Sequence, residues 1–164
     1  MAFDRIAVVG ISGAGKSSFA RALAARTGLP LRHGDQLDWL PDWGVAPDSR
    51  IAEMHAAWIA ESRWIIEGWI DPDRVARLAR ADLVIDLDLP APVCARRVLL
   101  RMLRGVRRAE MPDGCIDRFS IRTLNWVLLK KERPFIDRAL AAAPPKRYVR
   151  LASPREAASW LEKL

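Results

Sequence analysis

The sequence predicts a single α/β domain in which helices cover both faces of a five-stranded parallel sheet. Three observations lead to this fold class. The chain has 164 residues, which is the size of one domain. Short apolar runs alternate along it with helical patterns, as is typical of β-α-β units. The runs show little polar alternation and are bounded by turn residues, which suits strands that are buried on both faces.

Each expected element has a local cause in the sequence. We expect strands over 6–9, 30–33, 64–67, 83–87 and 148–151, and helices over 16–27, 48–62, 72–80, 92–104, 118–131 and from 154 onward. Gly28 and Pro30 end the first helix, and an apolar stripe supports the second. Asp71 is expected to cap the third. Ser153–Glu156 form a capping box that opens the last helix. Residues 105–117 are expected to form a mobile loop outside the core.

Composition and charge exclude several classes of protein. Two cysteines and two histidines form neither a disulfide scaffold nor a zinc pattern. We see no signal peptide and no apolar run that could span a membrane, so a cytoplasmic location is expected. The formal net charge is +7, and the basic residues concentrate in 91–150. An anionic partner is therefore expected, either the phosphates of a small molecule or nucleic acid.

The strongest motif follows the first expected strand and opens the first helix. The segment from Gly10 to Ser17 reads GISGAGKS and matches the phosphate-loop pattern G-x-x-x-x-G-K-[ST]. In such a loop successive backbone N–H groups converge on a phosphate, and the helix N-terminus adds a positive field. Lys16 would reach the β- and γ-phosphates of ATP, and the Ser17 hydroxyl would ligate Mg²⁺. The expected phosphate-binding residues are Gly10, Ser12, Gly13, Ala14, Gly15, Lys16, Ser17 and Ser18.

Further motifs give the chain a family resemblance. They are GISGAGKSS at 10–18, GDQLDW at 34–39, RWIIEGW at 63–69, ADLVIDLDLP at 81–90, RRVLLRMLR at 96–104 and MPDGC at 111–115. With them, the chain resembles the adenylate-kinase-like P-loop kinases, in particular the bacterial topology modulation protein (FlaR) family, over nearly its whole length. The resemblance implies a P-loop NTPase fold with strand order 2-3-1-4-5, an acceptor-closing segment over about 34–62 and a short helical lid over about 101–122.

The resemblance also implies an activity. It points to an ATP-dependent kinase that uses Mg²⁺ and transfers the γ-phosphoryl group to a small acceptor, with a nucleoside or nucleotide favoured. A small-metabolite kinase, similar to those for shikimate or gluconate, is the alternative within this class. A nucleotide-regulated nucleic-acid-binding protein is the alternative outside it. We expect a monomer. No N-K-x-D motif occurs, which argues against a small GTPase.

Three carboxylates are candidates for acid–base work or for binding Mg²⁺. Glu67 ends the third strand and precedes Gly68, where related kinases often carry aspartate. Asp35 lies just past the second strand, and Asp38 follows it. Ligands of such sheets collect at the carboxyl ends of strands, so Asp35 or Glu67 would bind Mg²⁺ with Ser17 or take the acceptor's proton. An ordinary strand-end hydrogen bond or a loop cap is the simpler alternative.

The remaining candidates are aromatic and basic. Trp39 and Trp69 flank the strand-end carboxylates and, with Asp38, Gly68 and Arg118, would line the acceptor pocket, although ordinary packing also explains the tryptophans. Arg97, Arg101, Arg104 and Arg108 are spaced to share one helix face. The resemblance assigns Arg97 and Arg101 to the start of the lid, and Arg122, with Arg118 as second choice, to its far end. It places the turn at Ser153 beside the adenine. A solvated or nucleic-acid-binding face is the alternative for the arginines.

Overall fold

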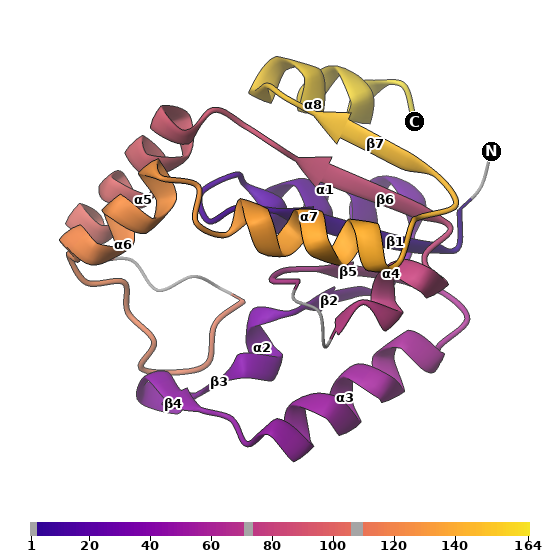
Figure 1. Ribbon diagram of the computed structural model, residues 1–164, viewed down its shortest axis with the longest axis horizontal. Coiled ribbons are helices and arrows are strands. Elements are labelled where there is room, and N and C mark those ends of the chain that lie inside the picture. Colours follow the sequence, from indigo (N-terminus) through magenta and orange to yellow (C-terminus); the bar gives the residue numbers. More distant parts are fainter. Residues whose placement is uncertain (1–2, 71–73, 106–109) are drawn as a thin grey trace.

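The computed structural model describes residues 3–70, 74–105 and 110–164. They form three layers, with one parallel sheet between two layers of helices (Figure 1). The sheet consists of β1 (Arg5–Gly10), β2 (Leu31–His33), β5 (Trp64–Glu67), β6 (Leu83–Leu87) and β7 (Tyr148–Leu151). Their order is β2-β5-β1-β6-β7, and all neighbours are parallel. Counted without the strands of a separate ribbon, this is the order 2-3-1-4-5. The expected fold class and topology are confirmed.

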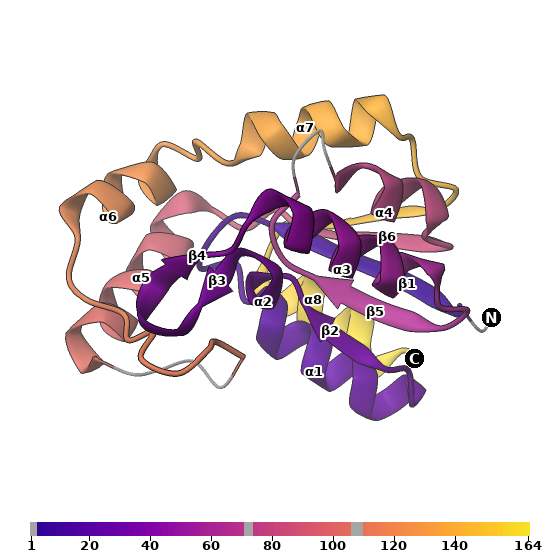
Figure 2. The same ribbon diagram turned by 90° about the horizontal axis from the view of Figure 1, so that it is seen from below.

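Helices cover both faces of the sheet. α1 (Lys16–Thr27) and α8 (Pro154–Glu162) lie on one face, and α4 (Ala76–Arg80) and α7 (Arg133–Ala142) lie on the other (Figure 2). α5 (Ala91–Arg104) and α6 (Ile121–Leu128) pack against each other at one end of the molecule.

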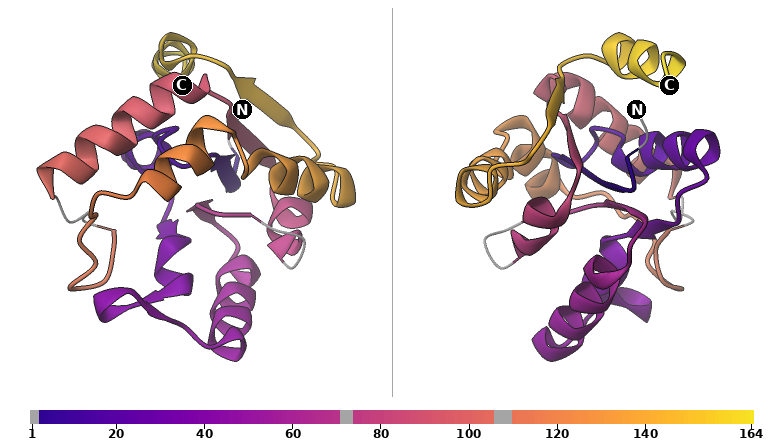
Figure 3. Two further views of the ribbon diagram at one scale, coloured as in Figure 1. Left: turned by 60° about the vertical axis from the view of Figure 1, so that its left-hand side comes forward. Right: turned by 90° about the vertical axis from the view of Figure 1, so that its right-hand side faces the viewer.

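The segment expected to close over the acceptor, about 34–62, forms a separate projection from the sheet (Figure 3). It contains the short helix α2 (Asp35–Asp38), an antiparallel ribbon of β3 (Trp39–Leu40) and β4 (Gly44–Val45), and α3 (Asp48–Ala60). A 3-10 turn, η1 (Pro41–Trp43), joins the two ribbon strands.

The core lies on both sides of the central strands. In β1, the side chains of Ala7, Val8 and Val9 have no solvent exposure, and in its neighbours Ile66 and Val84 have none either. A parallel sheet with two covered faces needs apolar residues at consecutive positions, which explains the unbroken apolar runs of the sequence. Among the described residues, none of the helices combines the length and the apolar character needed to cross a membrane.

Two expected helices differ in their limits. The helix expected over 118–131 spans only Ile121–Leu128, because the Ser120 hydroxyl accepts the Thr123 N–H and caps its start. It ends before Lys130, whose φ of 47° lies in the left-handed region. The third helix is described from Ala76, and Asp71, its expected cap, lies outside the described residues.

Three elements were not expected from the sequence: α2, the β3–β4 ribbon and α7. The expectation that 105–117 lies outside the core is also wrong for part of the segment. Met111 and Cys115 are buried, because this part of the chain packs on the ribbon. It has no regular helix or strand in its described residues, as expected, while residues 106–109, which include Arg108, lie outside them.

Candidate active site

The phosphate loop connects the end of β1 to the first turn of α1. A hydrogen bond of 3.1 Å from the Ala14 N–H to the Ile11 carbonyl closes the turn. Gly15 precedes the helix with φ at 93° and leaves the helix start without a side-chain cap. The free N–H groups of a helix start, with its partial positive charge, favour an anion at this point.

Gly13 is required where the loop meets α5. A Cβ atom at this position would lie 2.4 Å from the carbonyl oxygen of Cys94, so a larger residue would displace the loop. Arg97, one turn further along α5, donates to the carbonyls of Gly13 and Ala14 at 3.4 and 3.1 Å. The Lys16 ammonium group donates to the Ile11 carbonyl at 3.2 Å and lies across the loop. Helix α5 therefore supports the loop directly.

Glu67 lies at the end of β5, and its side chain is only 3% exposed. Its Oε1 atom lies 2.7 Å from Nδ1 of His33, the last residue of β2. A Cβ at Gly68 would come within 2.9 Å of the Gly34 Cα. The backbone that follows β2 and the backbone that follows β5 therefore approach as closely as glycine permits. Asp35 follows at the start of α2, and both carboxylates line the same cavity.

Asp38 is held by an arginine that the sequence did not single out. Arg74 binds it with both terminal nitrogens, and the Nη1–Oδ2 distance is 3.0 Å. The side chains of Asp38 and Arg74 are 22% and 10% exposed. Both oxygens of Asp38 are therefore engaged by one arginine, a charge-assisted pairing that fixes the position of this carboxylate.

Three indole rings stand on the cavity wall: Trp39, Trp43 and Trp69. Trp39 and Trp43 meet edge to face, with their ring centroids 5.2 Å apart. Trp69 packs on Phe135 of α7 with a centroid distance of 5.4 Å. These contacts fix the rings, so the wall is both aromatic and firmly positioned.

The roof of the cavity forms where residues 110–117, called the lid loop below, lie on the β3–β4 ribbon. The backbone N–H of Asp42 donates to Asp113 O at 2.9 Å, and the indole N–H of Trp43 donates to Ile116 O at 3.2 Å. The Cys115 thiol accepts the Trp43 backbone N–H at 3.3 Å and donates to Leu40 O at 3.4 Å. The lid loop and the acceptor-closing segment thus meet above the site.

The cavity that results has a volume of about 1440 Å³. Fifteen of the expected site residues line it: Ser12, Gly13, Ala14, Gly15, Lys16, Ser17, Ser18, Asp35, Asp38, Trp39, Glu67, Trp69, Arg97, Arg101 and Arg118. The structure therefore brings the phosphate loop, the strand-end carboxylates and part of the lid to one space.

Four expected residues lie off the cavity wall. Gly10 and Gly68 are buried beneath it. Arg122 is exposed on α6. The Ser153 hydroxyl accepts the Glu156 N–H at 3.1 Å and caps α8, while the following residue, Pro154, reaches the wall. Because α6 starts only at Ile121, Arg118 lies in the irregular segment before it, and this residue lines the cavity whereas Arg122 does not.

The lid arginines differ in their contacts. Arg101 lines the cavity, and its Nε atom lies 2.5 Å from Oδ2 of Asp117, a buried carboxylate of the lid loop. Arg104 is exposed on the same helix. The expected shared face thus places Arg97 and Arg101 at the site, and Asp117 offsets part of its positive charge.

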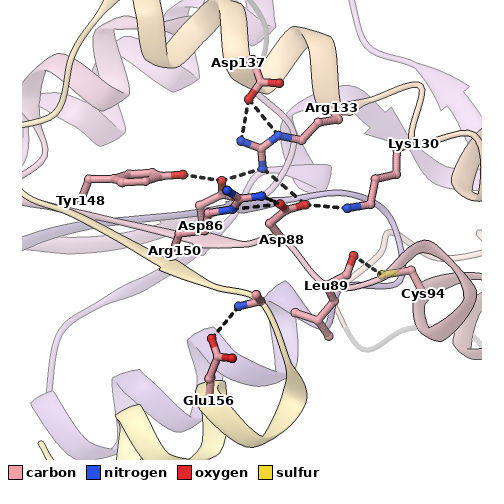
Figure 4. Close-up of polar contacts among 11 residues, drawn as sticks. Asp86, Asp88, Leu89, Cys94, Lys130, Arg133, Asp137, Tyr148, Arg150 and Glu156 are labelled. Carbon is pink, nitrogen blue, oxygen red and sulfur yellow. Dashed lines mark hydrogen bonds and ion pairs between the residues drawn. The ribbon is translucent and has the colours of Figure 1, made fainter.

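Asp86 and Asp88 organise a network of charged groups behind the cavity (Figure 4). Asp86 accepts hydrogen bonds from Arg133 at 2.6 Å and from the Tyr148 hydroxyl at 2.7 Å. Asp88 accepts the Lys130 ammonium group at 2.8 Å and is also bound by Arg150. The network ties α7 and β7 to the end of β6.

Burial and pairing act in opposite directions on this network. Burial alone would raise the pKa of Asp88, but hydrogen bonds from Lys130 and Arg150 outweigh it and lower that pKa. Partial desolvation and the hydrogen bond to Asp86 raise the pKa of Tyr148, which is 42% exposed, to about 12. Asp88 is therefore charged and Tyr148 neutral over the physiological pH range.

Glu132 was missed altogether by the sequence analysis. It precedes α7, is buried, lines the cavity and binds Ser12. The sequence does contain a signal for the helix α7 that follows Glu132. Pro134 lies in its first turn, where proline is favoured, and Ile136, Ala139 and Ala143 follow at helical spacing.

The residues present suit a magnesium nucleotide. Among the described residues, no three or more His, Cys, Asp or Glu side chains are grouped to hold a metal ion. Mg²⁺ is usually bound by one or two protein oxygens together with phosphate oxygens and water. The Ser17 hydroxyl and the carboxylates of Asp35 and Glu67 line the cavity next to the phosphate loop and provide such oxygens.

Comparisons with known proteins reveal likeness in structure rather than in sequence. No family model and no curated protein matches the chain. A shikimate kinase from Acinetobacter baumannii, in complex with shikimate, superposes with a TM-score of 0.66 at 15% identity, covering 98% of this chain and 89% of the other. A sugar kinase from a Janibacter species gives 0.56 at 19% identity, covering 98% and 91%.

A shikimate kinase from Bacteroides thetaiotaomicron is also similar, with a TM-score of 0.55 at 16% identity and coverage of 99% and 96%. At these identities the likeness establishes the fold and nothing more. The chain has the α/β fold of P-loop kinases, with a five-stranded parallel sheet and helices on both faces.

Proposed function

We propose that this protein is an ATP-dependent phosphotransferase that moves the γ-phosphoryl group of Mg-ATP to a hydroxyl group of a small acceptor. The observation that carries the proposal is the shared cavity. The phosphate loop with Lys16, the carboxylates of Asp35 and Glu67, and Arg118 from the lid all face one space of about 1440 Å³. Phosphoryl transfer needs this combination of positioning and positive charge more than it needs covalent chemistry.

Each group then has a distinct role. The loop N–H groups and Lys16 would hold the β- and γ-phosphates, and Arg97, Arg101 and Arg118 would offset charge on the transferred group. Ser17 and Glu67 would hold Mg²⁺, which when bound screens the charge of the phosphate oxygens. Asp35, which lies just past the end of β2 at the start of α2 and lines the cavity, would accept the proton of the acceptor hydroxyl.

The acceptor is better described as a small hydroxylated metabolite than as a nucleotide. A carboxylate at the acceptor side would repel the phosphate of a nucleotide acceptor but would orient a hydroxyl. The kinases with similar structures act, by their names, on shikimate or on a sugar. The topology modulation protein resemblance gives no chemical reason to prefer another acceptor. A nucleoside remains the second choice, since Trp39 and Trp69 would suit a planar base.

A nucleic-acid-binding role is less well supported. Part of the positive charge of 91–150 is engaged internally: Arg101 pairs with Asp117, Arg133 with Asp86, and Lys130 and Arg150 with Asp88. A paired arginine gains less from a phosphate backbone, because it must first give up its carboxylate. We further propose a monomer that works in the cytoplasm.

A substrate screen tests the proposal. ATP consumption and ADP release would be measured with Mg²⁺ against sugars, hydroxylated acids, nucleosides and nucleotides. We expect turnover with one group of hydroxylated compounds, and its loss in Lys16→Ala, while Lys163→Ala, which changes an exposed lysine at the C-terminal end, keeps it. No ATP consumption with any acceptor, or equal consumption in Lys16→Ala, would contradict the proposal.

A further inference from the structure

Glu132 lies with its carboxylate against the phosphate loop. Its Oε2 atom accepts the backbone N–H of Ser12 at 2.6 Å, and its Oε1 atom accepts the Ser12 hydroxyl at 2.6 Å. The glutamate is only 7% exposed, and both residues line the cavity. Ser12 therefore gives both of its donors to one buried carboxylate that lies 120 residues further along the chain.

The charged network sets the position of Glu132 from both sides. Lys130 binds Asp88 and Arg133 binds Asp86, so the residues around Glu132 are tied to the end of β6 (Figure 4). Lys130 adopts a φ of 47°, which turns the chain between α6 and α7. The segment 130–133, which follows α6 and is called the base of the lid below, is thus fixed to the end of β6.

A carboxylate beside an anion site would, by charge alone, weaken phosphate binding. The contact with Ser12 must therefore contribute something that offsets this weaker phosphate binding. The N–H that Glu132 accepts belongs to Ser12, which precedes the turn from Gly13 to Lys16. Glu132 therefore holds the segment that leads into the turn, while the N–H groups of the turn itself remain directed at the phosphate site.

We propose that Glu132 is a positioning residue of the phosphate loop, through which the base of the lid fixes the loop in the conformation that binds phosphate. The loop's ligand is taken from the proposed function, but the contact itself does not depend on it. Glu132 acts through Ser12, whereas Lys16 and the loop N–H groups contact the nucleotide. Because α6 leads directly into the segment 130–133, the lid and the loop share one anchor.

Amide hydrogen exchange in the nucleotide-free protein tests the contact. Glu132→Ala leaves both Ser12 donors without their partner, so exchange in residues 11–16 should become about tenfold faster. Glu132→Gln keeps an oxygen for the N–H, and its amide group can donate to the Ser12 hydroxyl, so it should restore most of the protection. Glu61→Ala, which removes a partly exposed ion pair with Arg32, is the matched control and should leave amide exchange in residues 11–16 unchanged.

Calorimetric titration with Mg-ADP tests the consequence. Glu132→Ala should weaken binding about tenfold, and Glu132→Gln should bind nearly as well as the wild type. Unchanged exchange and affinity, with only a lower melting temperature, would overturn the proposal. Tighter binding in both variants would also overturn it, because Glu132 would then merely compete with phosphate. A wild-type protein that binds no Mg-ADP would contradict the proposed function, while the exchange data would still decide the role of Glu132.

Discussion

The indole N–H of Trp43 donates to the carbonyl oxygen of Ile116 at 3.2 Å, and this bond joins the acceptor-closing segment to the lid loop. Both Asp42 and Trp43 have positive φ angles, of 57° and 61°. Residues other than glycine adopt this region at a cost. The contacts with the lid loop offset that cost, so the ribbon turn and the roof of the cavity stabilise each other.

Replacing Trp43 by phenylalanine should loosen the roof, because the ring remains but the N–H donor is lost. A hydrogen bond of this kind contributes about 1 kcal/mol, so amide exchange in residues 111–117 should become about fivefold faster. Mass-spectrometric hydrogen exchange measures this. Trp160→Phe, which alters a ring that packs on Phe19 elsewhere in the molecule, is the control. Equal exchange in the wild type and Trp43→Phe would mean that the indole N–H does not hold the roof.

The sheet and the phosphate loop could be predicted because their causes are local. Each strand is an apolar run that two covered faces require, and the loop motif specifies its own turn. The ribbon could not be predicted in this way. The left-handed conformations of Asp42 and Trp43 depend on bonds to Asp113, Cys115 and Ile116, which lie about 70 residues away in the sequence.

The choice between Arg118 and Arg122 shows the same limit within the site. Spaced by four, they would share a face if one helix covered 118–131, and the family resemblance favours Arg122 over Arg118 for the far end of the lid. The Ser120 cap starts α6 only at Ile121. Arg118 therefore lies in the segment that lines the cavity and Arg122 on the exposed side of the helix.

Asp35→Asn and Glu67→Gln should each lower Mg²⁺-dependent turnover while nucleotide binding survives. Both changes remove a negative charge with little change of shape, and loss of the residue that acts as the base should cost roughly 100-fold or more. Steady-state kinetics with the acceptor found in the screen, together with Mg-ADP titration, measure the two effects. Glu53→Gln, on the exposed side of α3, is the control. Near-normal rates in both variants would remove these carboxylates from the mechanism and turn attention to Asp38.

Tyr148 should ionise with a pKa of about 12, because partial desolvation and its hydrogen bond to Asp86 favour the neutral phenol. The raised pKa stabilises the folded protein below about pH 10, the value for an unfolded tyrosine, and this stabilisation is lost as the pH rises from about 10 to 12. The chain has one tyrosine, so absorbance at about 295 nm follows this group alone. Tyr148→Phe provides the blank, and circular dichroism verifies the fold at each pH. A midpoint near 10 in the folded protein would show that the bond to Asp86 does not form.

The matched pair Arg118→Ala and Arg122→Ala separates the kinase from a nucleic-acid-binding protein. If the cavity is an active site, Arg118→Ala should lower turnover at least tenfold and nucleotide affinity much less, because an arginine that offsets developing charge acts mainly in the transition state. Arg122→Ala, which changes an exposed residue off the cavity wall, should leave turnover near normal.

Duplex DNA should bind weakly, with an affinity that falls steeply as salt rises. If the basic face instead binds nucleic acid, both substitutions should reduce the salt dependence of DNA binding by about one phosphate contact each and leave ATP turnover unchanged. Titration of labelled DNA at two salt concentrations, beside the kinase assay, distinguishes the two results. Tight DNA binding at physiological salt, together with unchanged turnover in Arg118→Ala, would contradict the role proposed here for the lid.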